Sequence, residues 1–271
     1  MTIGQKIISI ILRGIFMNIV ITGGTSGLGL AMKNYYQGQG HTVFVLARSA
    51  SGENQIVCDV AKREDVLRAF TELSNKCTHI DMLINNAGVA LSGVTELLPA
   101  EEIEKIVDVN LNGVIHCTQC ALPLMRKGGK IINISSPCGD FPLPFRTMYC
   151  VTKSAVSMFS YCTRLELKNA GIQVSAICPG NIFTNLSKNR VKIESTNEKY
   201  GDAITKATEK INKEAGKRME LDWVCNKIVK LIGKKKLKAR YVIGKKYKFL
   251  YFVQRLVPQS WLLWGVNKFA G

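Results

Sequence analysis

The sequence predicts an α/β fold built on a doubly wound parallel sheet. Apolar runs rich in Val and Ile alternate with helical patterns from Met17 onward, and no internal repeat or low-complexity linker interrupts them. The first apolar run ends in a glycine-rich turn, where the backbone can change direction sharply. A length of 271 residues suits one α/β domain with a sizeable core. We therefore expect helices on both faces of one sheet.

Short apolar runs bounded by turn residues predict the strands. They are Asn18–Thr22, Thr42–Leu46, Gln55–Cys58, Met82–Asn85, Lys130–Ser135, Gln173–Cys178 and Tyr241–Ile243. Patterns with helical spacing predict helices at Gly27–Gln39, Lys62–Ser74, Glu101–Met125, Thr147–Asn169 and Leu221–Ile232. Helices between successive strands provide the crossovers that parallel pairing requires.

Three segments are expected: an N-terminal apolar extension (1–16), a main domain (17–250) and an amphipathic C-terminal tail (251–271). The apolar run in 1–16 is shorter than the ~20 residues of a membrane span. A core strand follows at once, without the cleavage site of a signal peptide. The run is either an extension of little consequence or an interfacial helix, and Met17 is an alternative start.

The nine cysteines are odd in number and scattered, which indicates a reducing compartment rather than a disulfide framework. Cys117 and Cys120 form a C-x-x-C inside a helical pattern, with no second pair nearby. We interpret them as helix core and expect no metal site.

The net charge of +17 is concentrated in the last third of the chain. Residues 1–186 carry 16 Lys and Arg against 13 Asp and Glu, whereas 187–271 carry 21 against 7. The lysine runs 234–236 and 245–246 belong to no recognised nucleic-acid module, so we expect no nucleic-acid partner.

The glycine-rich turn predicts a dinucleotide site. Glycines let the backbone approach a pyrophosphate closely, and the helix that follows directs its N-terminus at the negative charge. The spacing is T-G-x-x-x-G-x-G rather than the general G-x-G-x-x-G. The expected cofactor-binding residues here are Thr22, Gly23, Thr25, Ser26, Gly27, Leu28 and Gly29.

The end of the second strand favours NADP(H) over NAD(H). An acidic residue there usually holds the ribose 2′-hydroxyl, but this chain has Ala47 followed by Arg48. A guanidinium can pair with a 2′-phosphate; the alternative is a solvated loop charge. Asp59, next to Val60 after the third strand, is placed to accept from the adenine amino group.

A tyrosine and a lysine four residues apart, Tyr149 and Lys153, share one face of a predicted helix. A fixed ammonium favours the phenolate and should lower the pKa of the tyrosine. Ser136, at the end of the preceding strand, offers a hydroxyl to the same region. Together these groups can hold a carbonyl oxygen and hand it a proton.

These motifs occur in the order and spacing of the short-chain dehydrogenase/reductase family, which the chain resembles over about residues 17–186. The resemblance includes Asn85–Gly88, Asn110 and Pro179–Gly180, and the interval to Tyr149 selects Ser136 over Ser135. It implies a Rossmann fold, with hydride transfer between the nicotinamide and a carbonyl or secondary alcohol. Tyr149 is the implied general acid/base, Lys153 also binds the ribose, and Asn110 anchors a water. Further implied cofactor contacts are Asn86, Ala87, Gly88, Pro179, Gly180, Ile182 and Thr184.

The substrate is expected to be a lipophilic ketone or alcohol, such as a steroid, retinoid or lipid. Ser136 and Tyr149 would meet its oxygen, and Phe141, Leu143 and Phe145 would form an apolar wall. The alternative is that these apolar residues pack on a neighbouring subunit or on a helical lid, expected at about 184–220. A 3-oxoacyl-thioester reductase and a non-catalytic NADP-binding regulator are the alternative functions.

The C-terminal tail mixes aromatic residues with Lys and Arg. Such a segment can lie on a membrane surface, or it can cover the substrate pocket or a dimer interface. We therefore expect a cytoplasmic homodimer or homotetramer with a possible peripheral membrane contact.

Overall fold

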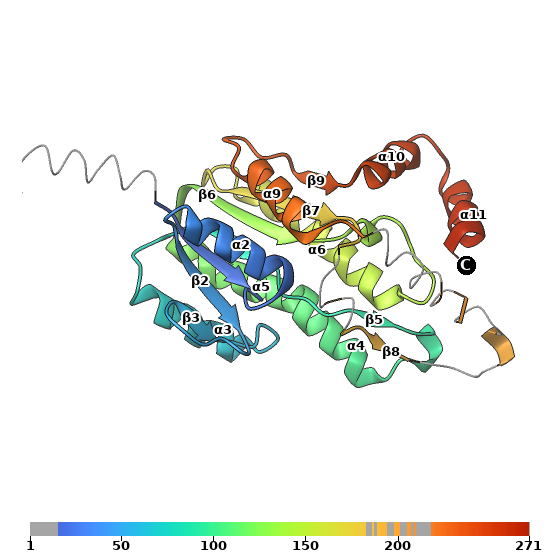
Figure 1. The fold of residues 1–271 in the computed structure, drawn as a ribbon, viewed down its shortest axis with the longest axis horizontal. Helices are drawn as coiled ribbons and strands as arrows, with labels where there is room; N and C mark the ends of the chain where they lie inside the picture. The colour runs from blue at the N-terminus through green and yellow to red at the C-terminus, as the bar shows by residue number, and fades with distance from the viewer. Residues whose placement is uncertain are drawn as a thin grey trace, which may run out of the picture.

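In the computed structural model, seven parallel strands form the central sheet of the described residues, which are 16–182, 186, 189–193, 198–200, 205–206, 209 and 218–270 (Figure 1). Their order across the sheet is β3-β2-β1-β4-β6-β7-β9. The strands are β1 (Asn18–Thr22), β2 (Thr42–Ala47), β3 (Gln55–Val57), β4 (Ile80–Asn85), β6 (Met125–Ile134), β7 (Gln173–Pro179) and β9 (Arg240–Ile243). The predicted doubly wound sheet is confirmed.

Alternate residues of each strand face opposite layers of helices. Ile19 and Ile21 of β1 pack toward α2 (Gly27–Gly38) and α9 (Leu221–Ile232). Val20 packs on the other face, in a cluster with α3 (Arg63–Ser74) and α5 (Gly113–Ala121). The helix α6 (Thr147–Glu166) lies on this second face too, where Ser160 accepts a hydrogen bond from Asn133 of β6 at 2.9 Å.

The long helix predicted at Glu101–Met125 is wrong, because the chain divides there. It forms α4 (Ala100–Val107), a π-helical turn (Asp108–Asn112) and α5, and β6 begins at Met125 rather than at Lys130. Asn110 lies in the π turn and is fully buried. Its carboxamide bonds to Val89 and to Thr152 of α6, so a tertiary contact stabilises the irregular turn.

The carboxyl ends of the inner strands meet at one edge of the sheet. Asn85 of β4 lies in register with Asn133 of β6, and Ile134 lies in register with Ile177 of β7. The strand order reverses between β1 and β4, and ligands of doubly wound sheets bind at such a point. We therefore expect the predicted catalytic and cofactor-binding residues to lie together at this edge.

The segment after β7 returns past this edge and was expected to form a helical lid. Its described part includes β8 (Val191–Lys192), which pairs with β5 (Leu91–Ser92) as a second, parallel ladder that the sequence did not predict. Most of 184–220, with Thr184, lies outside the described residues, as does the segment 1–15.

Two helices follow the sheet, α10 (Lys245–Gln254) and α11 (Gln259–Ala270), and they project to one side of it in Figure 1. None of the helices in the described ranges combines the length and apolar character that crossing a membrane requires.

Candidate active site

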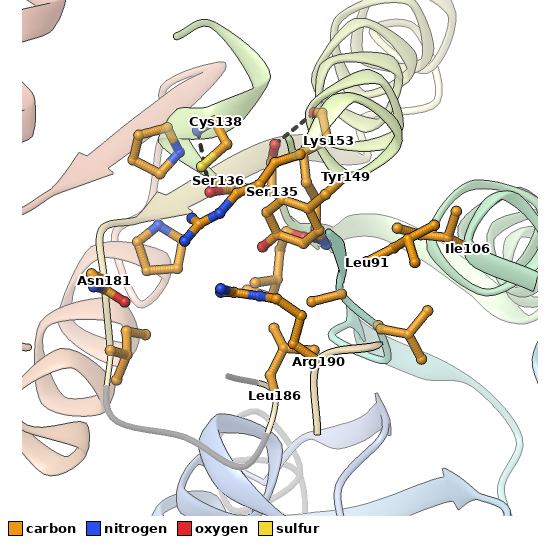
Figure 2. A pocket seen from close by; sticks show the side chains of 18 of the residues that line it. Leu91, Ile106, Ser135, Ser136, Cys138, Tyr149, Lys153, Asn181, Leu186 and Arg190 are labelled. Carbon is orange, nitrogen blue, oxygen red and sulfur yellow. Dashed lines mark hydrogen bonds between the residues drawn. The ribbon is translucent and has the colours of Figure 1, made fainter. Parts of the chain in front are cut away.

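A cavity of about 1880 Å³ lies at the carboxyl edge of the sheet (Figure 2). Its walls come from the glycine-rich turn, from the loops after β2, β3, β4, β6 and β7, and from α10 and α11. The cavity therefore extends from the expected dinucleotide end to the C-terminal tail, with Tyr149 and Lys153 between them.

The tyrosine and lysine occupy adjacent turns of α6 and share the cavity wall. Lys153 Nζ donates to the carbonyl of Ile134 at 3.0 Å and lies 5.9 Å from the centroid of the Tyr149 ring. The Ser136 hydroxyl acts on the Tyr149 phenol and favours its ionised form. Ser136 also accepts from the backbone N–H of Cys138 at 3.2 Å, which fixes its side chain at the start of the loop.

The two adjacent serines have different surroundings. Ser135 Oγ donates to the carbonyl of Lys153 at 2.8 Å and lies 2.9 Å from Ser157 Oγ, so its hydroxyl is used in holding β6 against α6. Ser136 instead reaches the phenol. This arrangement supports Ser136, rather than Ser135, as the serine beside the reacting oxygen.

The pKa of Tyr149 differs from the sequence expectation. Burial raises it, although the Ser136 hydrogen bond and the charges of Arg146 and Arg190 oppose that change. Burial also lowers the pKa of Lys153 to about 8. The expected lowering by Lys153 fails because desolvation of the phenolate dominates, while the ammonium points to the Ile134 carbonyl.

Asn110 supports the site without lining the cavity. Its Oδ1 accepts from the N–H of Val89 at 2.8 Å, and its Nδ2 donates to the Val89 carbonyl at 3.0 Å and to Thr152 Oγ1 at 3.2 Å. The side chain therefore fixes the strand-end loop beside Gly88. The anchored water that the resemblance implies would have to use the backbone of the π turn rather than this carboxamide.

The glycine-rich turn has the shape that a pyrophosphate site requires. Gly23 has a left-handed φ of 66°, and a Cβ on Gly29 would lie only 2.3 Å from the Gly23 carbonyl oxygen. Thr22 Oγ1 accepts the N–H groups of Asn86 and Ala87 at 2.9 and 3.0 Å. Thr22 thus ties the turn to the loop after β4, and these residues fit a dinucleotide phosphate.

The far end of this region carries Arg48, exposed at the cavity rim. Thr25 Oγ1 lies 3.4 Å from Ser49 Oγ beside it, so two hydroxyls accompany the guanidinium. Ser49 was not among the predicted cofactor-binding residues, although it follows Arg48 directly. Asp59 also lines the cavity, and its carboxylate accepts from the N–H of Ala61 at 3.1 Å.

Most of the predicted site residues line the cavity. They are Gly23, Thr25, Ser26, Gly27, Leu28, Arg48, Asp59, Val60, Asn86, Ala87, Gly88, Ser136, Phe141, Leu143, Tyr149, Lys153, Pro179, Gly180 and Ile182. Thr22, Gly29 and Asn110 lie behind that wall.

Phe145 is a correction to the predicted apolar wall. It is not among the residues that line the cavity, and its carbonyl accepts the N–H of Gly93 at 2.9 Å. Phe145 lines a separate small pocket with Val94 and Tyr200. Phe145 therefore supports β5 instead of meeting the substrate.

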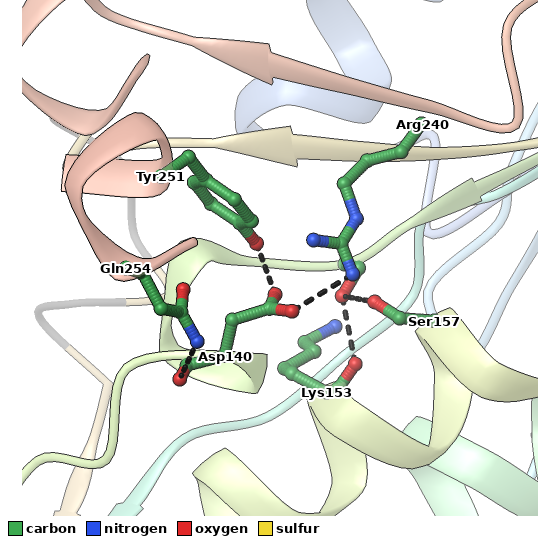
Figure 3. Close-up of polar contacts among 7 residues, drawn as sticks. Asp140, Lys153, Ser157, Arg240, Tyr251 and Gln254 are labelled. Carbon is green, nitrogen blue, oxygen red and sulfur yellow. Dashed lines mark hydrogen bonds and ion pairs between the residues drawn. The ribbon is translucent and has the colours of Figure 1, made fainter. Parts of the chain in front are cut away.

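The C-terminal tail is attached to the loop that carries the predicted catalytic serine (Figure 3). Asp140 of that loop accepts from Arg240 Nη2 at 2.8 Å and from the Tyr251 hydroxyl of α10, while its carbonyl accepts from Gln254 at 3.3 Å. The Phe141 and Tyr251 rings meet edge to face at 5.2 Å. These contacts hold α10 beside the cavity, and no local pattern in the sequence predicted them.

Several other lining residues were missed. Cys138, Arg146, Arg190 and Tyr247 all line the cavity. Tyr247 accepts the N–H of Asn181 at 3.1 Å through its hydroxyl. The order of the motifs places Cys138 and Arg146 between Ser136 and Tyr149, which could have identified them. Arg190 lies in a Lys-rich segment without a distinguishing pattern.

The fold and the site define a nucleotide-binding α/β protein with a tyrosine–lysine pair at the end of its cofactor cleft. Its sequence matches the profile of the family described as short chain dehydrogenase over residues 17–195. The chain belongs to the short-chain dehydrogenase/reductase family, and it is an oxidoreductase of the kind that works with a nicotinamide cofactor.

Two curated relatives are similar over nearly their whole lengths. A probable short-chain type dehydrogenase/reductase of Helicobacter pylori is 33% identical over 253 residues, covering 89% of this chain and 93% of the relative. A 3-ketodihydrosphingosine reductase of Bacteroides thetaiotaomicron is 32% identical over 261 residues, covering 93% and 95%. A short-chain dehydrogenase structure from Streptomyces avermitilis shares the fold, with a TM-score of 0.78 at 23% identity and coverage of 89% and 94%.

Proposed function

We propose that this protein transfers hydride between NADP(H) and the carbonyl or secondary alcohol of a lipophilic molecule. The observation that carries the proposal is that Tyr149, Ser136 and Lys153 line one cavity, which continues between Phe141, Leu143 and the tail helices. A bound nicotinamide would supply or accept the hydride. The residues of the chain then hold the oxygen and move its proton.

The proposed roles follow from the contacts. Ser136 holds the substrate oxygen, and Tyr149 donates the phenolic proton during reduction or takes it back during oxidation. The raised pKa of Tyr149 keeps the phenol protonated at neutral pH, which suits the reduction direction. Lys153, one turn away, is placed to hold the ribose hydroxyls, and Asn110 positions the loop that flanks them.

The apolar part of the cavity supports a lipophilic substrate. Its lining includes Leu250 and Val253 of α10, Val257 after that helix, and the buried Phe141. One of the roles expected for the tail was to cover the substrate pocket, and this lining supports that role. The similar protein from Bacteroides is named for a ketone with a long hydrocarbon chain, which is consistent with the same class.

Initial rates with NADPH and with NADH, over a panel of lipophilic ketones, test the function and its cofactor together. We expect NADPH to be oxidised preferentially. Arg48→Asp should lower the ratio of kcat/KM for NADPH to that for NADH by roughly 10–100-fold, because a repelling carboxylate replaces a charge-assisted phosphate contact. Lys62→Asp, an equal charge reversal at an exposed residue outside the cavity wall, is the control. An unchanged ratio in Arg48→Asp would refute the assignment.

We further propose a homo-oligomer that uses the outer face of α6. Val151, Met158 and Leu165 are exposed at intervals of seven residues, so they form one apolar stripe along the helix. A second copy of the same stripe is a suitable partner, since dimers bury self-complementary surfaces.

A peripheral membrane contact is proposed for the outer face of the tail helices. On α10 the cavity-facing residues alternate with Phe249 and Phe252, which are 65% and 62% exposed. Lys245, Lys248 and other basic residues flank these rings. Aromatic rings beside cations are typical of helices that lie at an anionic membrane surface.

Flotation with anionic liposomes measures this contact. Wild type should float at low salt and less at high salt. The double substitution Phe249→Ser and Phe252→Ser should reduce partitioning by roughly tenfold or more, because it removes two exposed rings that membrane binding would bury. Trp223→Ser removes a 46% exposed aromatic from α9 and should leave flotation intact. Wild-type protein that stays at the bottom of the gradient at low salt would exclude the contact.

A further inference from the structure

Two arginines line the cavity near Tyr149, and neither has a role in the proposed catalysis. Arg146 immediately precedes α6, and Arg190 immediately precedes β8. Figure 2 shows the Arg190 side chain extending into the cavity toward the phenol of Tyr149. The charges of Arg146 and Arg190 act on Tyr149 and on each other, so the two guanidiniums and the phenol form one cluster.

The cavity provides these cations with no carboxylate. Among its described lining residues, the acidic side chains are Asp59 and Glu102. Asp59 lies at the expected adenine end, and Glu102 is paired with Lys105 at 3.0 Å. Within the described ranges, neither Arg146 nor Arg190 forms an ion pair or a side-chain hydrogen bond. Two partly buried positive charges therefore face the space beside Tyr149, an arrangement that an anion between them would stabilise.

Burial and, to a smaller extent, the adjacent charge of Arg146 together lower the pKa of Arg190 to about 10. The Cys138 thiol is a candidate counterion, because its interaction with Cys150 lowers the pKa of Cys138 below the usual thiol range. One thiolate carries a single charge, so the cluster would still be positive.

We propose that Arg146 and Arg190 bind an anionic group of the substrate, for which a phosphate monoester is the best match. Guanidinium groups match the geometry of phosphate oxygens, and two of them match a dianion. The carbonyl would then lie at Tyr149 and the phosphate a few bonds away, with the hydrocarbon chain extending toward α10 and α11. This inference rests on the proposed function and narrows its substrate to phosphorylated, lipid-like ketones or the corresponding alcohols.

A matched pair of substrates tests the inference: a long-chain 1-hydroxy-2-alkanone and its phosphate monoester, each reduced with NADPH. Wild type should prefer the phosphate ester by roughly tenfold or more in kcat/KM. Arg146→Gln and Arg190→Gln should each lower this preference by roughly 10–100-fold, the usual effect of losing a charge-assisted hydrogen bond. Arg190→Lys should recover part of it, because the charge remains but the fork is lost. Arg126→Gln, an exposed charge at the start of β6, should preserve the preference.

Inhibition by inorganic phosphate provides a second measurement. During reduction of the neutral ketone by wild type, phosphate should compete with the ketone, and Arg190→Gln should weaken that inhibition. Competition with NADPH alone would place the anion at Arg48 and overturn the proposal. Cys138→Ser should retain the preference for the ester; a preference that is absent in wild type and appears only in Cys138→Ser would instead assign the arginines to the thiolate.

The phosphate site and the reductase function can be refuted separately. If wild type reduces both ketones equally well and the arginine variants change both rates alike, the phosphate site is refuted while the reductase function stands. If wild type reduces neither of these ketones nor any of the wider panel, the proposed function itself fails.

Discussion

Tyr149→Phe is expected to reduce kcat by about 10²–10⁴-fold, the usual contribution of a general acid. The substitution removes only the phenolic hydroxyl and leaves the aromatic ring in place on α6. The cofactor contacts proposed for Lys153 and the glycine-rich turn do not involve this hydroxyl. The dissociation constant for NADPH should therefore change little, within about threefold on the scale of a surface substitution.

Tyr35→Phe is the matched control for this experiment. Tyr35 presents its phenol on the outer side of α2, away from the cavity, so the loss of that hydroxyl should not affect turnover. Rates are measured by NADPH consumption and affinity by direct titration of cofactor fluorescence. If Tyr149→Phe retained a tenth or more of the wild-type rate, Tyr149 would not be the proton donor.

Gly29→Ala is expected to have the second large effect, on cofactor affinity. The new Cβ would lie 2.3 Å from the Gly23 carbonyl oxygen and 2.5 Å from Asn86 Nδ2, so backbone on the cofactor side of the turn must move. Overpacking of this kind costs about 1–3 kcal/mol. If the displacement falls on the turn, NADPH should bind roughly 10–100-fold more weakly, because close approach to the pyrophosphate is lost.

The same helix supplies the control, Gly38→Ala. Nothing lies within 4 Å of a Cβ added at Gly38, the last residue of α2. Alanine there should leave NADPH affinity unchanged and stabilise the protein slightly, by at most about 0.5–1 kcal/mol, because alanine loses less backbone entropy than glycine. Equal NADPH affinities in the two variants and in wild type would show that the turn tolerates a side chain and does not approach the phosphate.

The fold was predictable from local patterns because each buried strand is short and continuous in sequence. β1 and α9 have the predicted bounds, and most other elements differ by a few residues at their ends. The exception is the stretch Glu101–Met125, where apolar periodicity continues across a π-helical turn. Periodicity registers which residues are buried, and it cannot register that Asn110 bonds to Val89 instead of to its own helix.

The substrate end of the site was less predictable, because residues distant in sequence build it. Phe145 is adjacent to the site in sequence, but it lines a separate small pocket instead of the cavity. The attachment of α10 depends on Asp140 and on Arg240 and Tyr251, which follow it by 100 and 111 residues. Neither contact has a local pattern from which to infer it.

The sequence by itself determined the sheet, the glycine-rich turn and the tyrosine–lysine pair, since spacing along one strand or one helix fixes each of them. Tertiary structure alone decided the environment of those groups. Burial raises the pKa of Tyr149, against the expectation from its neighbour Lys153. The fold brings Arg146 and Arg190 to the same cavity from separate loops. Desolvation and long-range charge depend on what surrounds a group in space, and sequence spacing does not contain that information.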